Sequence, residues 1–189
     1  MHYGESSGDR PDLNLNHTAA MESLETLEDL FIHELRDLYD AEQQLIQSLP
    51  LLAQAAKSPE LKEGFETHLE ETREHVRRLE RIFNALGSSP SGKTCKAMQG
   101  LIAEARDTID QDADPDVLDA ALIVAAQKVE HYEIAGYGSV CTFARVLNLD
   151  DAAELLKATI DEEETTDRKL TQLAQAVNAK AETADQSLD

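Results

Sequence analysis

The chain has 189 residues, of which 41% are hydrophobic and 4% are aromatic, with no tryptophan. This length allows one domain of ordinary size with a real core, and the hydrophobic content excludes a chain disordered by composition. The net charge of −21 argues against nucleic acid or an anionic membrane as a partner, because neither would find a basic patch to dock on. Most of the acidic residues are expected to be solvated at the surface.

The two ends of the chain are polar. We expect residues 1–20 to form a flexible N-terminal arm and residues 178–189 a flexible C-terminal tail, with one domain over residues 21–177. The arm has no apolar central segment of the kind found in signal peptides, and no stretch approaches the roughly 20 apolar residues of a membrane span. Two cysteines, Cys95 and Cys141, do not make a disulfide framework. A cytoplasmic protein is therefore expected.

The sequence pattern favours helices throughout. Ala, Leu, Glu and Gln are abundant, and no run alternates as a strand would, so we predict an all-α fold. Four long helices are expected over residues 21–56, 59–86, 116–147 and 150–177, and a short one over residues 95–110. Ser58 and Pro59 are typical of a helix start, and Gly87 of a helix end. This order predicts a ferritin-like four-helix bundle whose long crossover carries the short extra helix.

Ionisable residues interrupt the apolar stripe of each long helix near its middle. They are Glu34 in the first helix, His75 with His68 as a further candidate in the second, Glu133 in the third, and Glu163 and Asp167 in the fourth. Glu130 lies one turn before Glu133 on the neighbouring row, and Glu71 lies at the edge of the stripe of the second helix. Two pairs are three residues apart, Glu34 with Asp37 in the first helix and Glu130 with Glu133 in the third. Two pairs are four residues apart, Glu71 with His75 in the second helix and Glu163 with Asp167 in the fourth. This echo indicates two hairpins related by a pseudo-twofold axis. Because the midpoints of bundled helices meet at one level, we expect these side chains to converge.

Six carboxylates cannot lie together ionised in a core without cations. A charge removed from water costs several kcal/mol unless it is paired, and two carboxylates about 4 Å apart repel by about 4 kcal/mol at an effective dielectric near 20. No Lys or Arg shares these stripe positions. The groups are therefore either protonated or neutralised by metal ions. Carboxylate oxygens with one imidazole suit Fe(II) or Mn(II), so two iron ions, or alternatively manganese, are the expected cofactors.

Several segments together resemble the YciE/YciF-type ferritin-like proteins, a bacterial family linked to stress. In chain order they are HELRDLYDAEQQL, HLEETREHVRRLERIFNALG, KTCKAMQGL, AAQKVEHYEIAGYGS and EEETTDRKLTQLA, and the resemblance spans about residues 22–177. It implies a di-metal site in a helical bundle, usually a dimer, with ligands at Glu34, Glu71, His75, Glu130, Glu133, Glu163 and Asp167. Two features depart from ordinary ferritin. Glu71 and His75 are four residues apart in place of Glu-x-x-His, and Asp167 stands where many relatives have His.

Three further residues are expected near the predicted centre. His68 and Asp37 are interpreted as orienting the ligands or as structural. Tyr137 lies seven residues after Glu130 on the same helix face. It is either a redox-active or ligand-orienting phenol, and so a candidate catalytic residue, or an ordinary core tyrosine.

Three functions remain open on the sequence. The first is a di-metal carboxylate protein that oxidises Fe(II) or consumes oxygen or peroxide in stress protection, and is thus a ferroxidase or peroxidase-like oxidoreductase. The second is a non-catalytic metal-binding protein or a scaffold of a stress assembly. The third is a metal-free acidic bundle. Metal ions, oxygen or peroxide, and a second copy of the chain in a homodimer are the expected partners. No paired CxxC motifs indicate an additional rubredoxin-like iron module.

Overall fold

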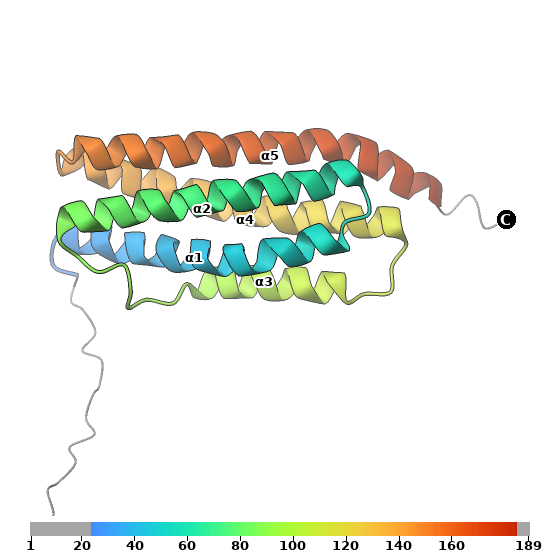
Figure 1. Cartoon of the computed structure of the whole chain (residues 1–189), viewed down its shortest axis with the longest axis horizontal. Helices are drawn as coiled ribbons and strands as arrows, with labels where there is room; N and C mark the ends of the chain where they lie inside the picture. Colours follow the sequence, from blue (N-terminus) through green and yellow to red (C-terminus); the bar gives the residue numbers. More distant parts are fainter. Residues whose placement is uncertain (1–23, 185–189) are drawn as a thin grey trace, which may run out of the picture.

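The computed structural model describes residues 24–184, which form five α-helices and no strand. The helices are α1 (Leu27–Ala55), α2 (Pro59–Leu86), α3 (Lys96–Ile109), α4 (Pro115–Val146) and α5 (Asp150–Ala184). Four long helices run along the longest axis of the molecule, and the short α3 packs outside them against α1 and α4 (Figure 1). The predicted ferritin-like four-helix bundle with a helix in its crossover is confirmed.

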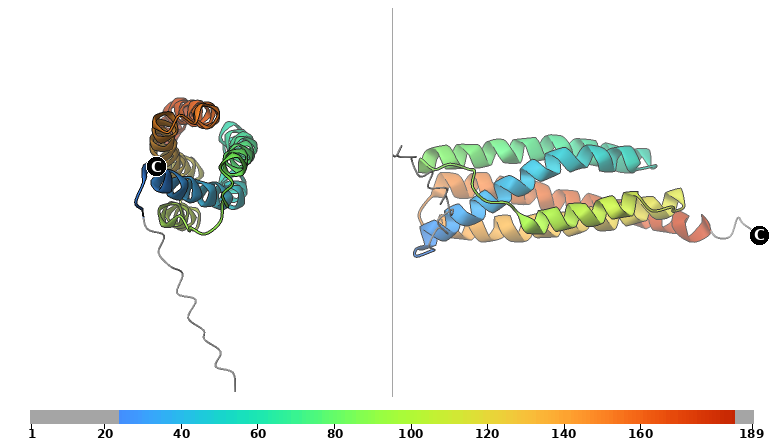
Figure 2. Two further views of the ribbon diagram at one scale, coloured as in Figure 1. Left: turned by 90° about the vertical axis from the view of Figure 1, so that its left-hand side faces the viewer. Right: turned by 90° about the horizontal axis from the view of Figure 1, so that it is seen from below.

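The bundle consists of two antiparallel hairpins, α1 with α2 and α4 with α5, which the crossover through α3 connects. Seen end-on in Figure 2, the four long helices surround one interior. A buried carboxylate fastens the turn of the first hairpin to the second hairpin. Asp119 of α4 accepts hydrogen bonds from the backbone N–H groups of Lys57 at 2.8 Å and Ser58 at 2.6 Å. This contact joins the two hairpins, and one face of every long helix lines the interior that they share.

Local capping decides where the first two helices begin and end. Thr26 and Asp29 form a reciprocal capping box, so α1 begins at Leu27 and the predicted start at residue 21 is wrong. The expected signals of α2 are confirmed. The Ser58 hydroxyl accepts from the backbone N–H of Leu61 at 3.3 Å, and Gly87 ends the helix with a left-handed φ of 61°.

The last helix is longer than predicted. It continues past residue 177 to Ala184, so the expected flexible tail is wrong for residues 178–184, which are rich in the helix formers Ala, Lys and Glu. The predicted arm over residues 1–20 and the final residues 185–189 lie outside the described part of the chain. Among the described helices, none has the length and apolar character needed to cross a membrane.

The interior has two hydrophobic ends with a polar band between them. We call one the aromatic end; it lies at the left of Figure 1 and contains Phe31, Leu35, Leu38, Leu79, Ile82, Phe83, Tyr137, Val140 and Leu156. We call the other the alanine-rich end; it contains Ala41, Leu45, Leu49, Leu52, Ala53, Phe65, Ala105, Ala126, Val129 and Leu170. Buried ionisable side chains occupy the level between these two clusters.

Candidate metal centre

Four glutamates and two histidines make up the polar band, and none is more than 3% exposed. They are Glu42 of α1, His68 and His75 of α2, Glu130 and Glu133 of α4, and Glu163 of α5. Glu130 and Glu133 are three residues apart on α4, so they lie on one face of that helix. His68 and His75 are seven residues apart on α2 and likewise share a face. Two groups of atoms able to bind a metal share Glu163, and within each group the atoms lie within 4.8 Å of one another.

His75 lies between inner and outer carboxylates. Its Nδ1 atom is 2.9 Å from Glu163 Oε1 and 3.3 Å from Glu42 Oε1. Its Nε2 atom is 2.9 Å from Glu162 Oε2, and Glu162 is held in turn by Arg78, whose Nη2 donates to Oε1 at 2.8 Å. An outer carboxylate that holds one ring nitrogen fixes the orientation of the other, as is usual for histidines that bind metals.

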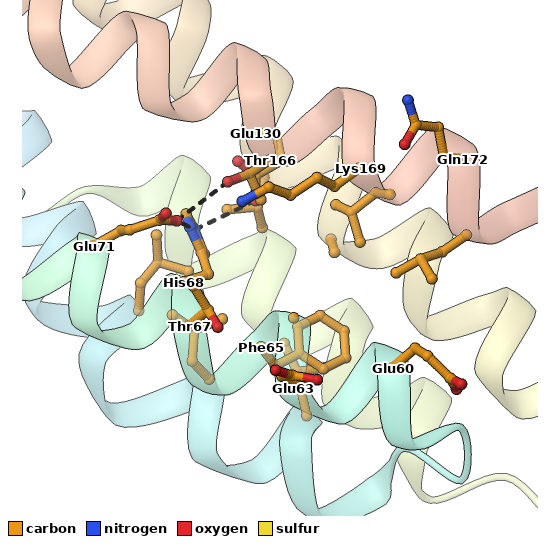
Figure 3. Close-up of a pocket in the computed structure, with 18 of the residues that line it drawn as sticks. Glu60, Glu63, Phe65, Thr67, His68, Glu71, Glu130, Thr166, Lys169 and Gln172 are labelled. Atoms are coloured by element: carbon orange, nitrogen blue, oxygen red, sulfur yellow. Dashed lines mark hydrogen bonds and ion pairs between the residues drawn. The ribbon is translucent and has the colours of Figure 1, made fainter.

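His68 has the same arrangement with weaker contacts. Its Nε2 atom is 3.4 Å from Glu130 Oε1, and its Nδ1 atom is 3.5 Å from Glu71 Oε2 (Figure 3). The Thr166 hydroxyl donates to the same Glu71 oxygen at 3.4 Å. The centroids of the His68 and His75 rings are 6.4 Å apart. Each histidine thus directs one nitrogen inward and the other toward an outer glutamate.

The negative charge of the band is not balanced by basic side chains. Among the described residues, no Lys or Arg pairs with the four buried glutamates, and both carboxylate oxygens of Glu133 have no hydrogen-bond partner. Burial, together with the neighbouring carboxylates, raises the pKa of Glu130 and Glu133 well above its usual range. The protein by itself must therefore hold protons at these positions, or bind cations.

His75 supplies a positive charge in the same place. Burial lowers the pKa of the His75 imidazole, but the charge of Glu42 and the hydrogen bonds with Glu162 and Glu163 outweigh it and raise the pKa. Burial likewise opposes the ionisation of Glu163, but its hydrogen bond with His75 keeps its pKa below the usual range. One imidazolium cannot neutralise four carboxylates, so negative charge remains that metal ions can balance.

The donor set fits two divalent ions. Four carboxylates offset the charge of two such ions, and two neutral imidazoles complete the inventory of four glutamates and two histidines that is typical of di-iron and di-manganese bundles. Oxygen and imidazole donors of this kind suit iron and manganese. The distribution differs from that template, because both histidines come from α2 and α5 contributes a glutamate alone.

The structure brings together four of the seven predicted ligands, His75, Glu130, Glu133 and Glu163, and leaves three outside the two groups. Glu34 is a correction. Its side chain is 40% exposed and its Oε1 atom lies 3.6 Å from Lys93 Nζ. The buried stripe of α1 runs through Leu35 and Leu38 to Glu42, so the step after Phe31 is four residues and not three.

Asp167 and Glu71 also lie outside. Asp167 turns toward α4, where it accepts from Gln127 Nε2 at 3.2 Å and faces His131, because Thr166 takes the buried position on α5. Glu71 is 28% exposed and contacts the outer nitrogen of His68 and the Thr166 hydroxyl.

Glu42 is the site residue that sequence reasoning missed, and His68 belongs to the inner group and not only to its surroundings. A signal for Glu42 existed. In the sequence LRDLYDAEQQLIQSL, it interrupts an apolar series that continues on both sides, through Leu35 and Leu38 before it and Leu45 and Leu49 after it.

Tyr137 and Asp37 occupy different environments. Tyr137 is fully buried and its hydroxyl donates to Glu42 Oε1, so it contacts a carboxylate of the candidate centre. Burial and the charge of Glu42 raise the pKa of Tyr137, so the phenol stays a donor. Asp37 accepts from the Tyr132 hydroxyl and lies 3.0 Å from Lys93 Nζ, away from both groups. Of the two roles considered for Asp37, these contacts support the structural one.

Fold and centre together define a ferritin-like helical bundle with a buried carboxylate–histidine centre. A family model described as a domain of unknown function, DUF892, matches residues 26–182, and the chain belongs to this family. Over 162 residues it is 47% identical to protein YciF of Escherichia coli K12, an alignment that covers 85% of this chain and 98% of YciF. The resemblance to YciE/YciF-type proteins is confirmed.

Solved structures agree with this assignment. The E. coli stress protein YciF matches with a TM-score of 0.81 and 46% identity, over 83% of this chain and 99% of that one. YcfI of Rhodopseudomonas palustris, for which a structural role has been suggested, matches with a TM-score of 0.77 and 43% identity, over 80% and 97% of the two chains. A ferritin-like di-iron carboxylate protein of Bacillus anthracis gives 0.61 at 18% identity, over 78% and 96%, which supports the fold alone.

Proposed function

We propose that the buried centre binds two divalent ions of iron or manganese, and that the protein oxidises Fe(II) with peroxide or oxygen. The observation that carries this proposal is the set of four buried glutamates with unpaired oxygens, facing two histidines and no basic side chain. Hard carboxylate donors favour Fe(III) over Fe(II), which supports oxidation at this position.

Each histidine offers a defined nitrogen to a metal. Glu162 accepts from Nε2 of His75 and leaves Nδ1 facing inward, whereas Glu71 contacts Nδ1 of His68 and leaves Nε2 facing inward. Tyr137 limits the movement of Glu42. Binding requires the protons held between the inner groups to leave, so metal uptake releases protons.

Bound iron would supply the electrons, because two Fe(II) become two Fe(III) as one hydrogen peroxide takes up two protons and forms two water molecules. The protein surface supports the supply of cations. An acidic depression between α2 and α5 is lined by Glu63, Glu66, Glu70, Glu71, Glu74 and Glu162. Its two innermost members are the outer carboxylates of His68 and His75, so it favours the approach of cations to both histidines.

Metal content tests the proposal, with two glutamates of α1 as a matched pair. After anaerobic reconstitution with Fe(II), elemental analysis should give about two ions per chain. Glu42→Gln should lower this content, whereas Glu34→Gln should leave it unchanged because Glu34 lies at the surface. A metal-free wild-type protein after reconstitution would contradict the proposal.

A second measurement separates oxidation from metal binding without turnover. Near-ultraviolet absorbance of the Fe(II)-loaded protein should rise after stopped-flow mixing with peroxide, and Glu42→Gln should suppress this rise. Stable Fe(II) in the presence of peroxide would leave a metal-binding structural protein.

A further inference from the structure

A pocket of about 440 Å³ enters the bundle between α2 and α5 and ends at the centre (Figure 3). Most of its wall is apolar and belongs to the alanine-rich end, including Leu45, Leu49, Phe65, Val129 and Leu170. Its volume lies within the range of about 300–1,000 Å³ that is typical of small-molecule sites. Metal cations do not need such a wall, because the acidic depression beside it already leads to the outer carboxylates.

A glycine forms part of the wall of this pocket. Gly64 lies inside α2 and lines the pocket, and a Cβ atom added there would meet no heavy atom within 4 Å. Its backbone does not require glycine, since a left-handed φ occurs only at Gly87, Gly92 and Asn148 among the described residues. A glycine inside a helix is destabilising relative to alanine. Neither local sterics nor helix stability accounts for this residue, whereas access to the pocket does.

The inner end of the pocket is polar. His68 and Glu130, both buried, line it together with Thr166, and neither ring nitrogen of His68 has a well-formed hydrogen bond. A polar atom of an occupant could therefore bind there. The outer part carries Glu60 and Glu63, whereas Lys169 extends toward Glu71 and His68 in Figure 3. Acidic groups outnumber the basic one along the wall, which disfavours an anion.

We propose that this pocket binds a neutral, elongated apolar organic molecule, with its polar end at His68 and its hydrocarbon part against the alanine-rich end. This inference goes beyond the proposed metal chemistry, because the wall that binds the hydrocarbon does not depend on a metal. The pocket brings such a molecule directly beside the candidate metal centre.

Binding to the metal-free full-length protein is the first test. The neutral fluorophore 1-aminoanthracene should bind with increased emission, and 1-octanol should displace it at lower concentration than octanoate does at neutral pH. Gly64→Leu places a side chain in the mouth and should weaken probe binding by about tenfold or more. Gly138→Leu is the matched control, because Gly138 also lies in a helix with open space around it but does not line the pocket. Its probe affinity should be unchanged.

Several results would overturn the proposal. They are the absence of probe binding in the wild type, equal affinities of the two leucine variants, and octanoate displacing the probe better than octanol. Coverage of the pocket by a second copy of the chain would also overturn it. In that case sedimentation would show that Gly64→Leu changes the oligomeric state and Gly138→Leu does not.

Contact with the centre is tested separately with Mn(II)-loaded protein. Paramagnetic relaxation of bound 1-octanol should be strongest at the protons beside the hydroxyl and weakest at the terminal methyl. The reverse order would overturn the proposed orientation. Failure of Mn(II) to bind would contradict the proposed function alone, because probe binding to the metal-free protein is measured independently of it.

Discussion

The two ends of the interior are built from the same four helices but are packed differently. The aromatic end is filled by large rings, with Phe31 and Phe83 fully buried and Tyr39 packed edge-on against Phe83 at 6.2 Å between centroids. The alanine-rich end contains small residues such as Ala53 and Ala126 and leaves the 440 Å³ pocket. The aromatic end therefore holds the helices together by close packing, whereas the alanine-rich end provides space next to the centre.

The glycines of the two ends show the same contrast. A Cβ atom on Gly136 of α4 would lie 2.8 Å from Leu38 Cδ2, so this glycine allows α1 and α4 to approach closely at the aromatic end. Gly64, at the other end, faces open space. One glycine serves close packing and the other leaves a cavity.

The largest expected effect concerns the same substitution at both ends of α1. Leu35→Ala should lower the free energy of unfolding by about 4 kcal/mol, because a fully buried side chain leaves a cavity among rigid neighbours. Leu49→Ala should lower it by about 2 kcal/mol, because Leu49 already borders the pocket and has fewer atoms to lose contact with. Urea denaturation of the metal-free proteins measures both values. Equal losses would mean that the alanine-rich end is as tightly packed as the aromatic end.

The next effect concerns the two outer glutamates. Glu162→Gln should weaken Mn(II) binding by about 100-fold, because Glu162 holds the buried His75 at 2.9 Å and is itself fixed by Arg78. Glu71→Gln should weaken it by about tenfold only, since Glu71 is partly exposed and lies 3.5 Å from His68. Isothermal titration at one pH gives both affinities. A larger loss for Glu71→Gln would reverse the assignment of His75 as the more firmly oriented ligand.

The smallest effect concerns the two glycines. Gly136→Ala should lower the free energy of unfolding by about 1 kcal/mol, because overpacking against Leu38 exceeds the gain in helix propensity. Gly64→Ala should raise it by about 0.5–1 kcal/mol, because only the propensity changes. Thermal and urea unfolding of the two variants check the opposite signs. A stabilised Gly136→Ala variant would show that Leu38 can move aside without loss.

Much of the fold could be predicted because its signals are local. Ser58, Pro59 and Gly87 mark the ends of α2 through their own backbone and side-chain hydrogen bonds, and the order of helices and crossover defines the bundle. Glu130 and Glu133 could be predicted as site residues because they are charged side chains near the middle of a long, largely apolar helix.

Prediction was less successful where two alternative apolar stripes of one helix share several residues. In α1, the series through Glu34 and the series through Glu42 both contain Phe31, Leu38 and Leu45, so the pattern alone did not select between them. On α5 the sequence predicted Asp167 as the inward residue, but its neighbour, the polar and uncharged Thr166, is the buried one. Neighbouring positions on a helix differ by about 100° around its axis, so the rotation of the helix in the bundle decides which of them faces the interior.

By itself, the sequence determined the helices, the crossover and the accumulation of carboxylates at mid-helix, because these depend on periodicity and on residues close together in the chain. Only the tertiary structure decided which carboxylates meet. In the folded bundle Leu35 and Leu49 are buried on the same face as Glu42, which lies inward, whereas Glu34 lies beside Lys93. The pocket beside His68 has the same origin, since its wall combines residues of four helices that no local pattern connects.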